Sequence, residues 1–492
     1  MNIGYRKRVT ALLFFLLLVR FWFSQTFEVT GPEAYAWMKG HQLDWGYWDQ
    51  GPLVPWASWF GTLLFRNTEL GVRLFAVNVY IVVGFLFFYI GRSMFNPRVG
   101  FYALILYLVL PIYAWQMLFL SEATFSVGFM GLGLIVFRHM FTRDVWWDWL
   151  LGGLIIAGAT TLDWWNCLWA AGLFLFYMRD PQRTGRLMTP KTLMFLGTVA
   201  LGILPFLAYR CAITGPAGLT LTYFPMIHPH QFRDNTHSIT YFIRAQGIWL
   251  GPLGIVAMGF CFWIRRLGIP FFREHLLVLF LPIPGLIVQG ILVMFGRGDQ
   301  DVLAALWLPW LLLAAVIGAR LIDQGSIRRG IVMVLVVASL SESLCGFWPH
   351  PTPDWWGFRF APDPKRHPIE NVAAEVARWQ NETGASFLVT DSPQNASQLS
   401  FYLPLHAFVY IMPMEGIHSQ YDLWANYNDF NGATAIFLSR NLTTPPGEMI
   451  REFAEIKTLH DIAIPEQAPW RLFLCEHFGA SGPAGGESGV KN

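Results

Sequence analysis

The sequence predicts a polytopic α-helical membrane protein with a small α/β domain at its C-terminal end. Of the 492 residues, 54% are hydrophobic and only 13% are charged, and the mean hydropathy is +0.41. Apolar runs that can cross a hydrocarbon core of about 30 Å recur between residues 9 and 348. After Trp348 the composition changes to that of a soluble domain. The net charge of +2 gives no reason to expect a nucleic-acid partner.

We expect about eleven membrane-spanning helices, separated mostly by short polar loops. Their expected boundaries are 9–26, 73–91, 99–115, 119–137, 147–162, 164–178, 192–209, 246–264, 274–296, 302–319 and 330–347. Basic residues fall on alternate loops, beginning with residues 6–8 before the first span. By the positive-inside rule the N-terminus and these loops are cytoplasmic, so residues 27–72, 210–245 and everything after 348 face outward. We therefore expect a multi-pass protein of the inner (plasma) membrane.

Two domains follow from these patterns. Residues 1–348 form the expected transmembrane domain, and residues 349–492 form an extracytoplasmic α/β domain whose tail is disordered from about residue 479. Within the second domain, a helix is predicted at 369–383, and 395–404 is predicted to be a helix that enters a turn. Strands are predicted at 386–392, 406–412, 433–440 and 470–478.

The first outward loop contains the segment TGPEAYAWMKGHQLDWGYWDQGPLVPW, residues 30–56, which is rich in aromatic residues, carboxylates and prolines. This loop and the second long outward loop, residues 210–245, are far longer than the hairpins elsewhere, and long loops tend to carry function. Residues 52–65 are apolar on one side but too short to span, so we expect an amphipathic helix at the membrane interface. The sequence therefore favours a site between the two long loops.

Carboxylates near the outer membrane surface are the leading candidates for chemistry. Acidic side chains in or beside a span are costly unless they face a wet cavity. Glu122 is the clearest case, because it is the only ionisable group between Tyr113 and Arg138. The alternative is an interfacial carboxylate that simply reaches water. The other members of the set are Glu28, Glu33, Asp44, Asp49, Asp163, Asp299 and Asp301.

Arginines near the same surface are candidate ligands of a phosphate group. Arg20 lies in the outer half of the first span, where it needs a protein carboxylate or a lipid phosphate as counter-charge unless it reaches the interface. Three more lie at outer span ends, namely Arg210, Arg244 and Arg297. No nucleotide-binding glycine loop, metal box or Ser-His-Asp elbow occurs in the sequence. No cofactor is therefore expected, although a divalent metal ion is left open.

Taken together, four segments resemble the bacterial members of the family 39 glycosyltransferases. These segments are residues 32–56 of the first loop, FRNTELGVRLFAVN (65–78), VTDSPQNASQLSFYLP (389–404) and SQYDLW (419–424). That family comprises polyprenyl-phosphate-sugar-dependent enzymes of the GT-C fold, related to protein O-mannosyltransferases and to the aminoarabinose and galacturonic acid transferases of lipid A. The resemblance covers nearly the whole chain.

The resemblance also implies which residues would act. In the family the first external loop begins with an Asp-Glu pair whose Asp is taken to be catalytic, and here Pro32 and Glu33 stand at that pair. The family's second acidic residue is expected after the third span in a Pro-Asp-Ala type motif, where SEATFS departs from the pattern and offers Glu122 instead, and Asp163 stands where a lysine is common. The implied catalytic residues are Glu33, Glu122 and Asp44. The implied substrate-binding residues are Tyr35, Asp49, Asp163, Arg20, Arg210, Arg244 and Arg297.

The implied reaction moves a sugar from a polyprenyl phosphate to a hydroxyl of a lipid, glycan or protein acceptor, with inversion. A carboxylate takes the hydroxyl proton and arginines hold the departing phosphate. Because Pro32 replaces the expected Asp, Glu33 is either a displaced base or the remnant of a lost one. An inactive relative that binds a lipid-linked sugar during envelope polysaccharide assembly therefore stays an alternative. A transporter is less favoured, since the outer domain is large and the halves show no repeat.

Overall fold

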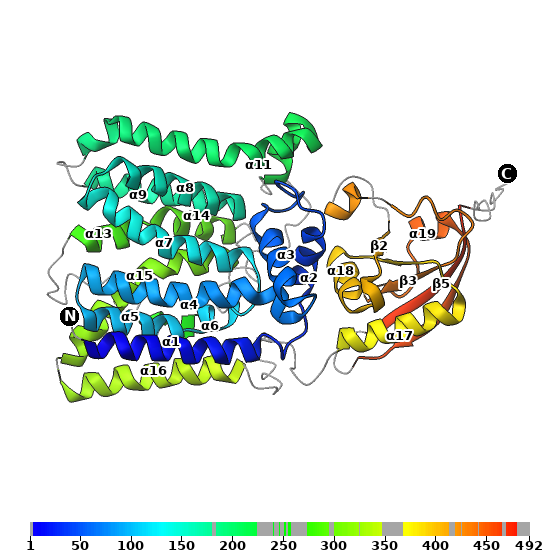
Figure 1. Cartoon of the computed structure of the whole chain (residues 1–492), viewed down its shortest axis with the longest axis horizontal. Helices are drawn as coiled ribbons and strands as arrows, with labels where there is room; N and C mark the ends of the chain where they lie inside the picture. The colour runs from blue at the N-terminus through cyan, green and yellow to red at the C-terminus, as the bar shows by residue number, and fades with distance from the viewer. Residues whose placement is uncertain are drawn as a thin grey trace, which may run out of the picture.

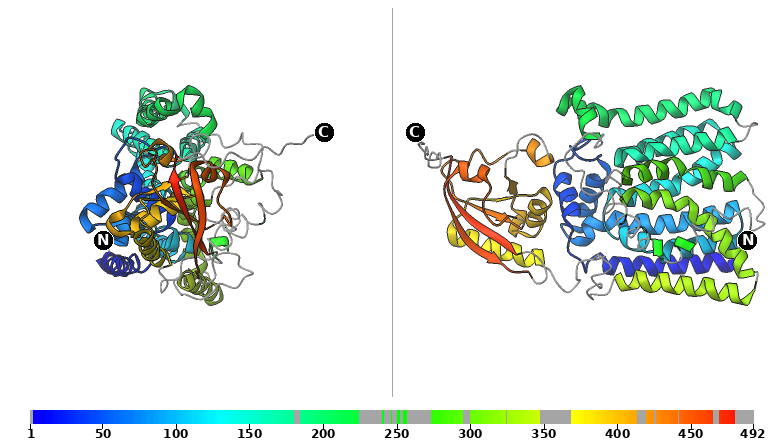
Figure 2. Two further views of the ribbon diagram at one scale, coloured as in Figure 1. Left: turned by 90° about the vertical axis from the view of Figure 1, so that its right-hand side faces the viewer. Right: turned by 180° about the vertical axis from the view of Figure 1, so that it is seen from behind.

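The computed structural model describes residues 3–179, 184–223, 273–294, 300–323, 325–346, 368–412, 419–424, 426–440, 442–464 and 469–479, with a few isolated positions between 240 and 256. A helical bundle and an α/β domain lie end to end, and α2 (Gly31–Gly40) and α3 (Leu53–Phe65) lie between them (Figures 1 and 2). The N-terminus lies at the far end of the bundle from the α/β domain. The end that carries α2 and α3 is hereafter the domain-side end.

The bundle is built from long apolar helices. They are α1 (Ile3–Phe23), α4 (Glu69–Met94), α5 (Pro97–Val109), α6 (Pro111–Gln116), α7 (Glu122–Thr142), α8 (Trp146–Leu162), α9 (Leu168–Arg179), α11 (Pro190–Tyr223), α13 (Arg273–Phe280), α14 (Ile283–Met294), α15 (Gln300–Asp323) and α16 (Ser326–Gly346), with short 3-10 helices η1 (Trp164–Cys167) and η2 (Gly185–Met188). Within the described residues, five helices are long and apolar enough to cross a membrane.

The expected spans overlap these helices, except that 246–264 lies largely outside the described residues. Two spans are divided. The span 99–115 consists of α5 and α6, because Leu110 is extended and Pro111 begins a new helix. The span 274–296 divides between α13 and α14 near Pro282. The total of about eleven helices stays a prediction.

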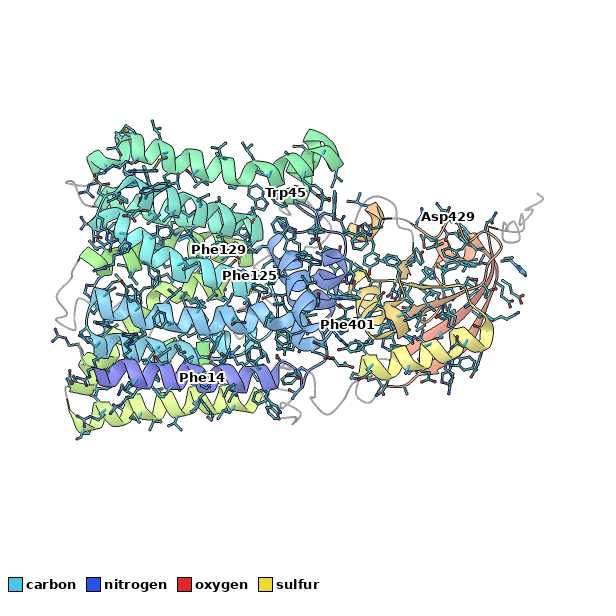
Figure 3. All side chains as sticks on the ribbon, viewed as in Figure 1. Phe14, Trp45, Phe125, Phe129, Phe401 and Asp429 are labelled. Carbon is cyan, nitrogen blue, oxygen red and sulfur yellow. The ribbon has the colours of Figure 1, made fainter. Side chains whose placement is uncertain are left out.

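Close helix contacts hold the bundle together. At the crossing of α4 and α5, a Cβ built on Gly91 would lie only 2.7 Å from the Cα of Gly100. Small residues of this kind let the backbones of membrane helices approach each other. Large apolar side chains such as Phe14, labelled on α1 in Figure 3, are instead exposed on the outside of the bundle. This distribution is the one expected for a surface that contacts lipid.

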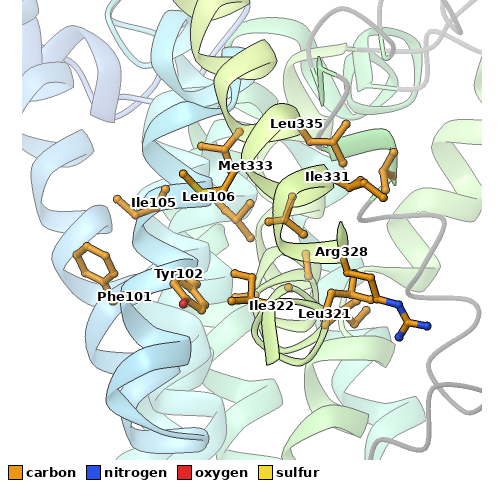
Figure 4. Close-up of a pocket in the computed structure, with 17 residues that line it drawn as sticks. Phe101, Tyr102, Ile105, Leu106, Leu321, Ile322, Arg328, Ile331, Met333 and Leu335 are labelled. Carbon is orange, nitrogen blue, oxygen red and sulfur yellow. The ribbon is translucent and has the colours of Figure 1, made fainter. Parts of the chain in front are cut away.

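An apolar cavity of about 670 Å³ lies between α5, α15 and α16 (Figure 4). Its walls are almost entirely aliphatic and aromatic, and Arg328 lies at its edge. Arg98 of α5 and Asp323 of α15 form an ion pair of 2.8 Å near this cavity. The cavity is in the half of the bundle away from the α/β domain, so it does not contribute to the polar site described below.

The amphipathic helix expected at residues 52–65 is α3. It buries Val54, Ala57 and Gly61 and exposes Leu63 and Leu64. Gly61 packs against the backbone of Gly71 in α4, where a Cβ would clash. The helix prediction is confirmed, and its exposed apolar face fits the expected interfacial position.

The α/β domain contains a mixed five-stranded sheet in the order β2-β1-β3-β5-β4. The strands are β1 (Phe387–Thr390), β2 (Val409–Ile411), β3 (Ala435–Ser439), β4 (Phe453–Ile462) and β5 (Trp470–Phe478), and the helices are α17 (Pro368–Thr383), α18 (Pro393–Tyr402), η6 (Pro404–His406), η7 (Gln420–Leu423) and α19 (Gly447–Glu452). β1 is parallel to β2 and β3, whereas β5 is antiparallel to β3 and β4. All four predicted strands and both predicted helices are confirmed.

Alternate residues of the buried strands enter two separate cores. Leu388 and Ile436 pack with apolar residues of α17, α18 and α2, whereas Phe387 and Phe437 enter an aromatic core on the opposite face. β4 was not predicted. It is an edge strand whose side chains are mostly exposed or half-buried, so its apolar signal is weak. The expected domain boundary at 348/349 and the expected tail beyond 479 lie outside the described residues.

The two bodies are joined by specific contacts. Glu28, which is 6% exposed, accepts hydrogen bonds of 3.0 Å on Oε1 from the backbone N–H groups of Ile369 and Glu370. A carboxylate at this position satisfies the free N–H groups of α17 and interacts favourably with its dipole. The ring of Trp37 in α2 contacts Phe401 of α18, with centroids 5.0 Å apart. The first loop therefore provides the surface against which the α/β domain packs.

Candidate active site

A cluster of charged and polar side chains lies at the domain-side end of the bundle. Lys39 Nζ lies 3.0 Å from Oδ1 of Asp49. With its amide oriented so that donors meet acceptors, Gln50 donates to Oε1 of Glu122 and accepts from Lys39 Nζ. Residues 39, 49 and 50 of the first loop are thereby joined to the first residue of α7.

Lys39 is the buried member of this cluster, at 1% exposure. It belongs to the last turn of α2, and its ammonium lies 3.8 Å from the centroid of the Tyr35 ring. Burial lowers the pKa of Lys39, while the charge of Asp49 acts in the opposite direction. Burial also raises the pKa of Tyr35, and the nearby carboxylate of Asp49 adds to this shift. Lys39 therefore balances and orients Asp49.

The carboxylates of the cluster remain accessible. The side chain of Asp49 is 38% exposed. Glu122 is half-buried and begins α7, where Ser121 caps the helix by accepting a hydrogen bond from the Thr124 N–H on its hydroxyl oxygen. Asp49 can thus meet a substrate while Lys39 holds it from the protein side.

Glu33 has a different environment from the rest of the candidate set. Arg73 Nε donates to Glu33 Oε1 at 2.8 Å, and Arg73 Nη2 donates to Oε2 at 2.6 Å. Oε2 also accepts from the backbone N–H and the hydroxyl of Thr30, which completes a capping box at the start of α2. Oε1 also accepts from the backbone N–H of Leu120 at 2.9 Å. Both side chains of the ion pair are buried.

The Arg73–Glu33 pair connects four parts of the chain. Arg73 of α4 also donates to the carbonyl oxygens of Ser24, Phe27 and Glu28, which follow α1. Through Leu120, Glu33 fixes the segment directly before Glu122. Both carboxylate oxygens of Glu33 thus accept hydrogen bonds from other parts of the chain, whereas the neighbouring Pro32 is exposed.

Asp44 and Asp163 make local contacts. Asp44 is exposed, and its Oδ1 accepts from the Trp45 N–H at 2.7 Å. Asp163 Oδ1 accepts from the Trp165 N–H and caps η1. Gly51 packs against the Thr161 carbonyl, where a Cβ would clash, so Asp163 belongs to the helix end on which the first loop rests. The hydrogen bonds of Asp44 stay within the first loop.

Arg20 caps a helix end. Its guanidinium donates to the carbonyl oxygens of Tyr113, Ala114 and Met117 at 2.6–3.3 Å and lies 3.2 Å from the Tyr80 ring centroid. Arg20 is buried, and the carbonyls at the end of α6 interact favourably with its charge. Its expected role as a phosphate ligand stays a prediction. Arg210 belongs to α11 but its side chain is not described, and Arg244 and Arg297 lie outside the described residues.

Three residues of this region were missed by the sequence analysis, namely Lys39, Gln50 and Arg73. A signal existed for Arg73, because an arginine at the start of an expected span requires a counter-charge. Lys39 and Gln50 carried no such signal, since both belong to a loop that was expected to be wet. Among the described residues there is no group of three or more His, Cys, Asp or Glu side chains that could hold a metal ion.

Comparisons with known proteins bear on this arrangement. The family model described as dolichyl-phosphate-mannose-protein mannosyltransferase matches residues 49–209. The crystal structure of ArnT from Cupriavidus metallidurans bound to undecaprenyl phosphate matches with a TM-score of 0.64 at 14% identity, over 96% of this chain and 98% of ArnT. The chain has the fold of the GT-C glycosyltransferases. Its resemblance to that group is thereby confirmed.

Other comparisons extend this result for the GT-C fold. The apo structure of the same ArnT matches with a TM-score of 0.63 at 14% identity, over 96% of this chain and 99% of ArnT. Arabinofuranosyltransferase AftD from Mycobacteria matches with a TM-score of 0.51 at 13% identity, over 97% of this chain and 40% of AftD. No curated protein sequence matches the chain. The matched part of the GT-C domain includes Asp49 and Glu122.

Proposed function

We propose that the protein is an integral-membrane glycosyltransferase that moves a sugar from a polyprenyl-phosphate donor to an acceptor hydroxyl. The GT-C fold and the match of residues 49–209 to a mannosyltransferase model support this activity. A structural neighbour binds undecaprenyl phosphate, which supports a polyprenyl-phosphate donor. The observation that carries the proposal is the cluster in which Asp49, Gln50 and Glu122, which belong to the matched region, surround Lys39 of α2.

Asp49 is the proposed general base. Its carboxylate is the exposed member of the Lys39–Asp49 pair, and Lys39 fixes its orientation from the buried side. In the reaction the acceptor oxygen forms a bond to C1 of the sugar as the bond from C1 to the phosphate oxygen breaks. The acceptor proton passes to Asp49, and the bonding electrons leave with the polyprenyl phosphate. General-base catalysis of this kind accelerates a reaction by a factor of about 10² to 10⁴.

Glu122 and Glu33 have supporting roles in this proposal. Glu122 holds the Gln50 side chain and so sets the loop that carries Asp49. Glu33 is a positioning residue, because its partners are Arg73 and the backbone before α7. Arg20 is likewise given a structural role, since its guanidinium donates to three carbonyls in and directly after α6. Asp163 stays a candidate ligand of the sugar, and the three other arginines stay candidate phosphate ligands.

The proposed topology follows from the distribution of basic residues. With the positively charged loops inside, α2, α3 and the α/β domain lie on the outer face of the inner membrane. The acceptor is then a hydroxyl of a lipid, glycan or protein that is exposed outside the cytoplasm. The exposed apolar face of α3 supports this arrangement, because it suits a helix that rests on the lipid headgroups.

An inactive relative is the second candidate function, and Pro32 is the observation that favours it. The expected Asp of the family is absent from that position, and Glu33 beside it is enclosed by protein donors. Such a protein would bind a lipid-linked sugar without turnover. Sugar transfer by the purified wild-type protein would exclude this second function.

The test is transfer of a radiolabelled sugar from polyprenyl phosphate to membrane acceptors in proteoliposomes. Asp49→Asn and Glu122→Gln are expected to lose transfer, whereas Glu382→Gln, which changes an exposed carboxylate of α17, is the matched control. Thermal unfolding of each variant separates lost chemistry from lost folding. Full activity of Asp49→Asn would overturn the assignment of the base.

A further inference from the structure

The α/β domain contains a cavity of about 200 Å³ that the proposed chemistry does not use. Its lining residues come from β2 and the residue before it, from η7 and the segment after it, and from the end of α19. Its walls combine aromatic rings with carboxylates and amides. The lining residues are Phe408, Tyr410, Ile411, Tyr421, Asp422, Trp424, Asn426, Tyr427, Asn428 and Glu452, hereafter the aromatic pocket.

The rings of the aromatic pocket support one another at large angles. Tyr421 and Trp424 have centroids 4.9 Å apart at 66°, and Phe408 and Tyr410 have centroids 4.8 Å apart at 73°. Tyr410 in turn meets Tyr427 at 5.7 Å and 86°. Edge-to-face contacts of this kind hold rings rigidly and leave flat faces available to a ligand. Trp424, Phe408 and Tyr410 are each half-buried, so part of each ring is accessible.

The polar groups of the pocket are held in fixed positions. Tyr427 donates to Glu452 Oε2 at 2.7 Å, and Asp422 Oδ2 accepts from the Ser419 N–H at 2.7 Å and from its hydroxyl at 3.0 Å. Asn426 and Asn428 add amides at the exposed edge. Neither lysine nor arginine occurs among the described lining residues. The pocket therefore favours a neutral or cationic ligand over an anionic one.

The aromatic pocket is connected directly to the candidate active site. The ring of Tyr421 stacks on that of Tyr35, with centroids 5.9 Å apart. The Gln420 N–H donates to the Tyr35 hydroxyl at 2.8 Å, and Gln420 Oε1 accepts from the Trp48 N–H, also at 2.8 Å. The same Tyr35 ring contacts the ammonium of Lys39. A chain-like molecule that extends from the pocket would thus reach toward Asp49.

We propose that the aromatic pocket binds one neutral or amino-substituted sugar unit of the acceptor, which is then a glycan or glycolipid. The C–H face of a sugar ring packs on aromatic rings, while its hydroxyl or amino groups donate to carboxylates and amides. The volume suits a single ring. The donor is a poorer occupant, because its phosphate requires cations and the lining contains carboxylates. This inference rests on the proposed function only in assigning the bound sugar to the acceptor.

Direct binding tests the pocket without any need for turnover. The full-length protein in lipid nanodiscs, free of glycoside detergent, is titrated with methyl glucoside, glucosamine and glucuronate, and binding is followed by saturation-transfer NMR. We expect binding of the first two and much weaker binding of glucuronate. Trp424→Ala should weaken binding about 2- to 10-fold. Glu452→Gln should weaken glucosamine binding about tenfold.

Matched variants make this result specific. Trp424→Phe retains an aromatic face and should restore most of the binding lost in Trp424→Ala. Glu455→Gln, which changes an exposed carboxylate of β4, should have no effect. Asp49→Asn should bind the sugars like the wild type, because the pocket does not include it. Equal binding of the three sugars, or binding that survives Trp424→Ala, would overturn the inference.

The kinetic test separates the acceptor from the donor. In the transfer assay, Trp424→Ala should raise KM for the acceptor with little change in kcat or in KM for the donor. A rise in donor KM alone would assign the pocket to the donor and overturn the inference. If the protein shows no transfer but binds sugars through Trp424, the proposed function fails while the pocket stands as a sugar site. If transfer occurs but no sugar binds, the pocket assignment fails and the proposed function stands.

Discussion

Arg73 and Glu33 form a buried bidentate ion pair, with Nε–Oε1 and Nη2–Oε2 distances of 2.8 and 2.6 Å. The pair fixes α2 to α4 and, through Leu120, fixes the start of α7. Glu33 stands beside the position at which related transferases have their catalytic Asp. In the proposed mechanism its partners make it a part of the scaffold that places Asp49 and Glu122.

Glu33→Gln is therefore expected to act first on stability. The substitution leaves the Arg73 guanidinium buried without its counter-charge, which costs about 3–5 kcal/mol when one partner of a buried pair is removed. Thermal unfolding in detergent should show a clearly lowered midpoint. Glu33→Leu combined with Arg73→Met should recover part of the loss, because no charge is then left unpaired. A wild-type midpoint together with abolished transfer would instead identify Glu33 as the base.

The second prediction concerns the pH dependence of transfer. Burial lowers the pKa of Lys39 below its ordinary value of about 10.4. As the pH rises through this lowered pKa, Lys39 loses its proton and Asp49 loses the cation that balances it. The value of kcat/KM should therefore fall on the alkaline side at a pH below about 10.4.

Lys39→Arg tests this assignment through the shape of the pH profile. Arginine stays protonated to a pH above about 12, so the alkaline decline should move upward whatever the absolute rate. Lys457→Arg, which changes an exposed residue of β4, is the control and should leave the profile unchanged. An alkaline decline at the same pH in Lys39→Arg would show that another group titrates.

Much of the fold was predictable because it depends on local patterns. The apolar runs predicted the bundle, and the buried strands β1 and β3 were evident because residues 387–390 and 435–439 are almost wholly apolar. β4 was not predicted, since its alternation is broken by the irregularity between Thr458 and His460 and most of it is exposed. Local patterns thus predict elements best where both faces are buried.

The site was less predictable because it depends on partners distant in sequence. Glu33 and Arg73 are 40 residues apart, and Glu33 and the Leu120 N–H are 87 apart. A carboxylate in a functional loop looks the same in sequence whether it faces a substrate or an arginine. Likewise, the carbonyls to which Arg20 donates belong to residues 113–117, more than 90 positions away in the chain. Only the folded arrangement shows that Glu33 meets an arginine inside the protein whereas Asp49 is exposed.

The third prediction concerns the joint between the two bodies. Glu28 accepts from the first N–H groups of α17, so Glu28→Ala should cost about 0.5–2 kcal/mol, as for other lost helix caps. Hydrogen exchange should become faster at the N-terminal amides of α17 and remain unchanged in β3. Glu370→Ala, on α17 itself, serves as the control for a lost surface carboxylate, because its backbone N–H still meets Glu28. Unchanged exchange in α17 would show that Glu28 does not hold the domain.

The last prediction tests position 32 directly. One face of α2 carries Pro32, Tyr35 and Lys39, because they are spaced 3 and 4 residues apart. Pro32 is exposed and lies about 10 Å from Lys39 along the helix axis. An Asp at position 32 would also stabilise α2 by about 0.3–1 kcal/mol, because a negative charge at a helix N-terminus interacts favourably with the helix dipole. The Pro32→Asp variant should therefore fold. In the Asp49→Asn background it should restore part of the lost transfer, because it places a carboxylate on the face that carries Tyr35 and Lys39. Pro32→Asn in the same background is the control and should restore none. Failure of Pro32→Asp to restore transfer would show that a carboxylate at position 32 does not reach the acceptor hydroxyl. Transfer that appears only in variants with Pro32→Asp would identify the wild-type protein as an inactive relative.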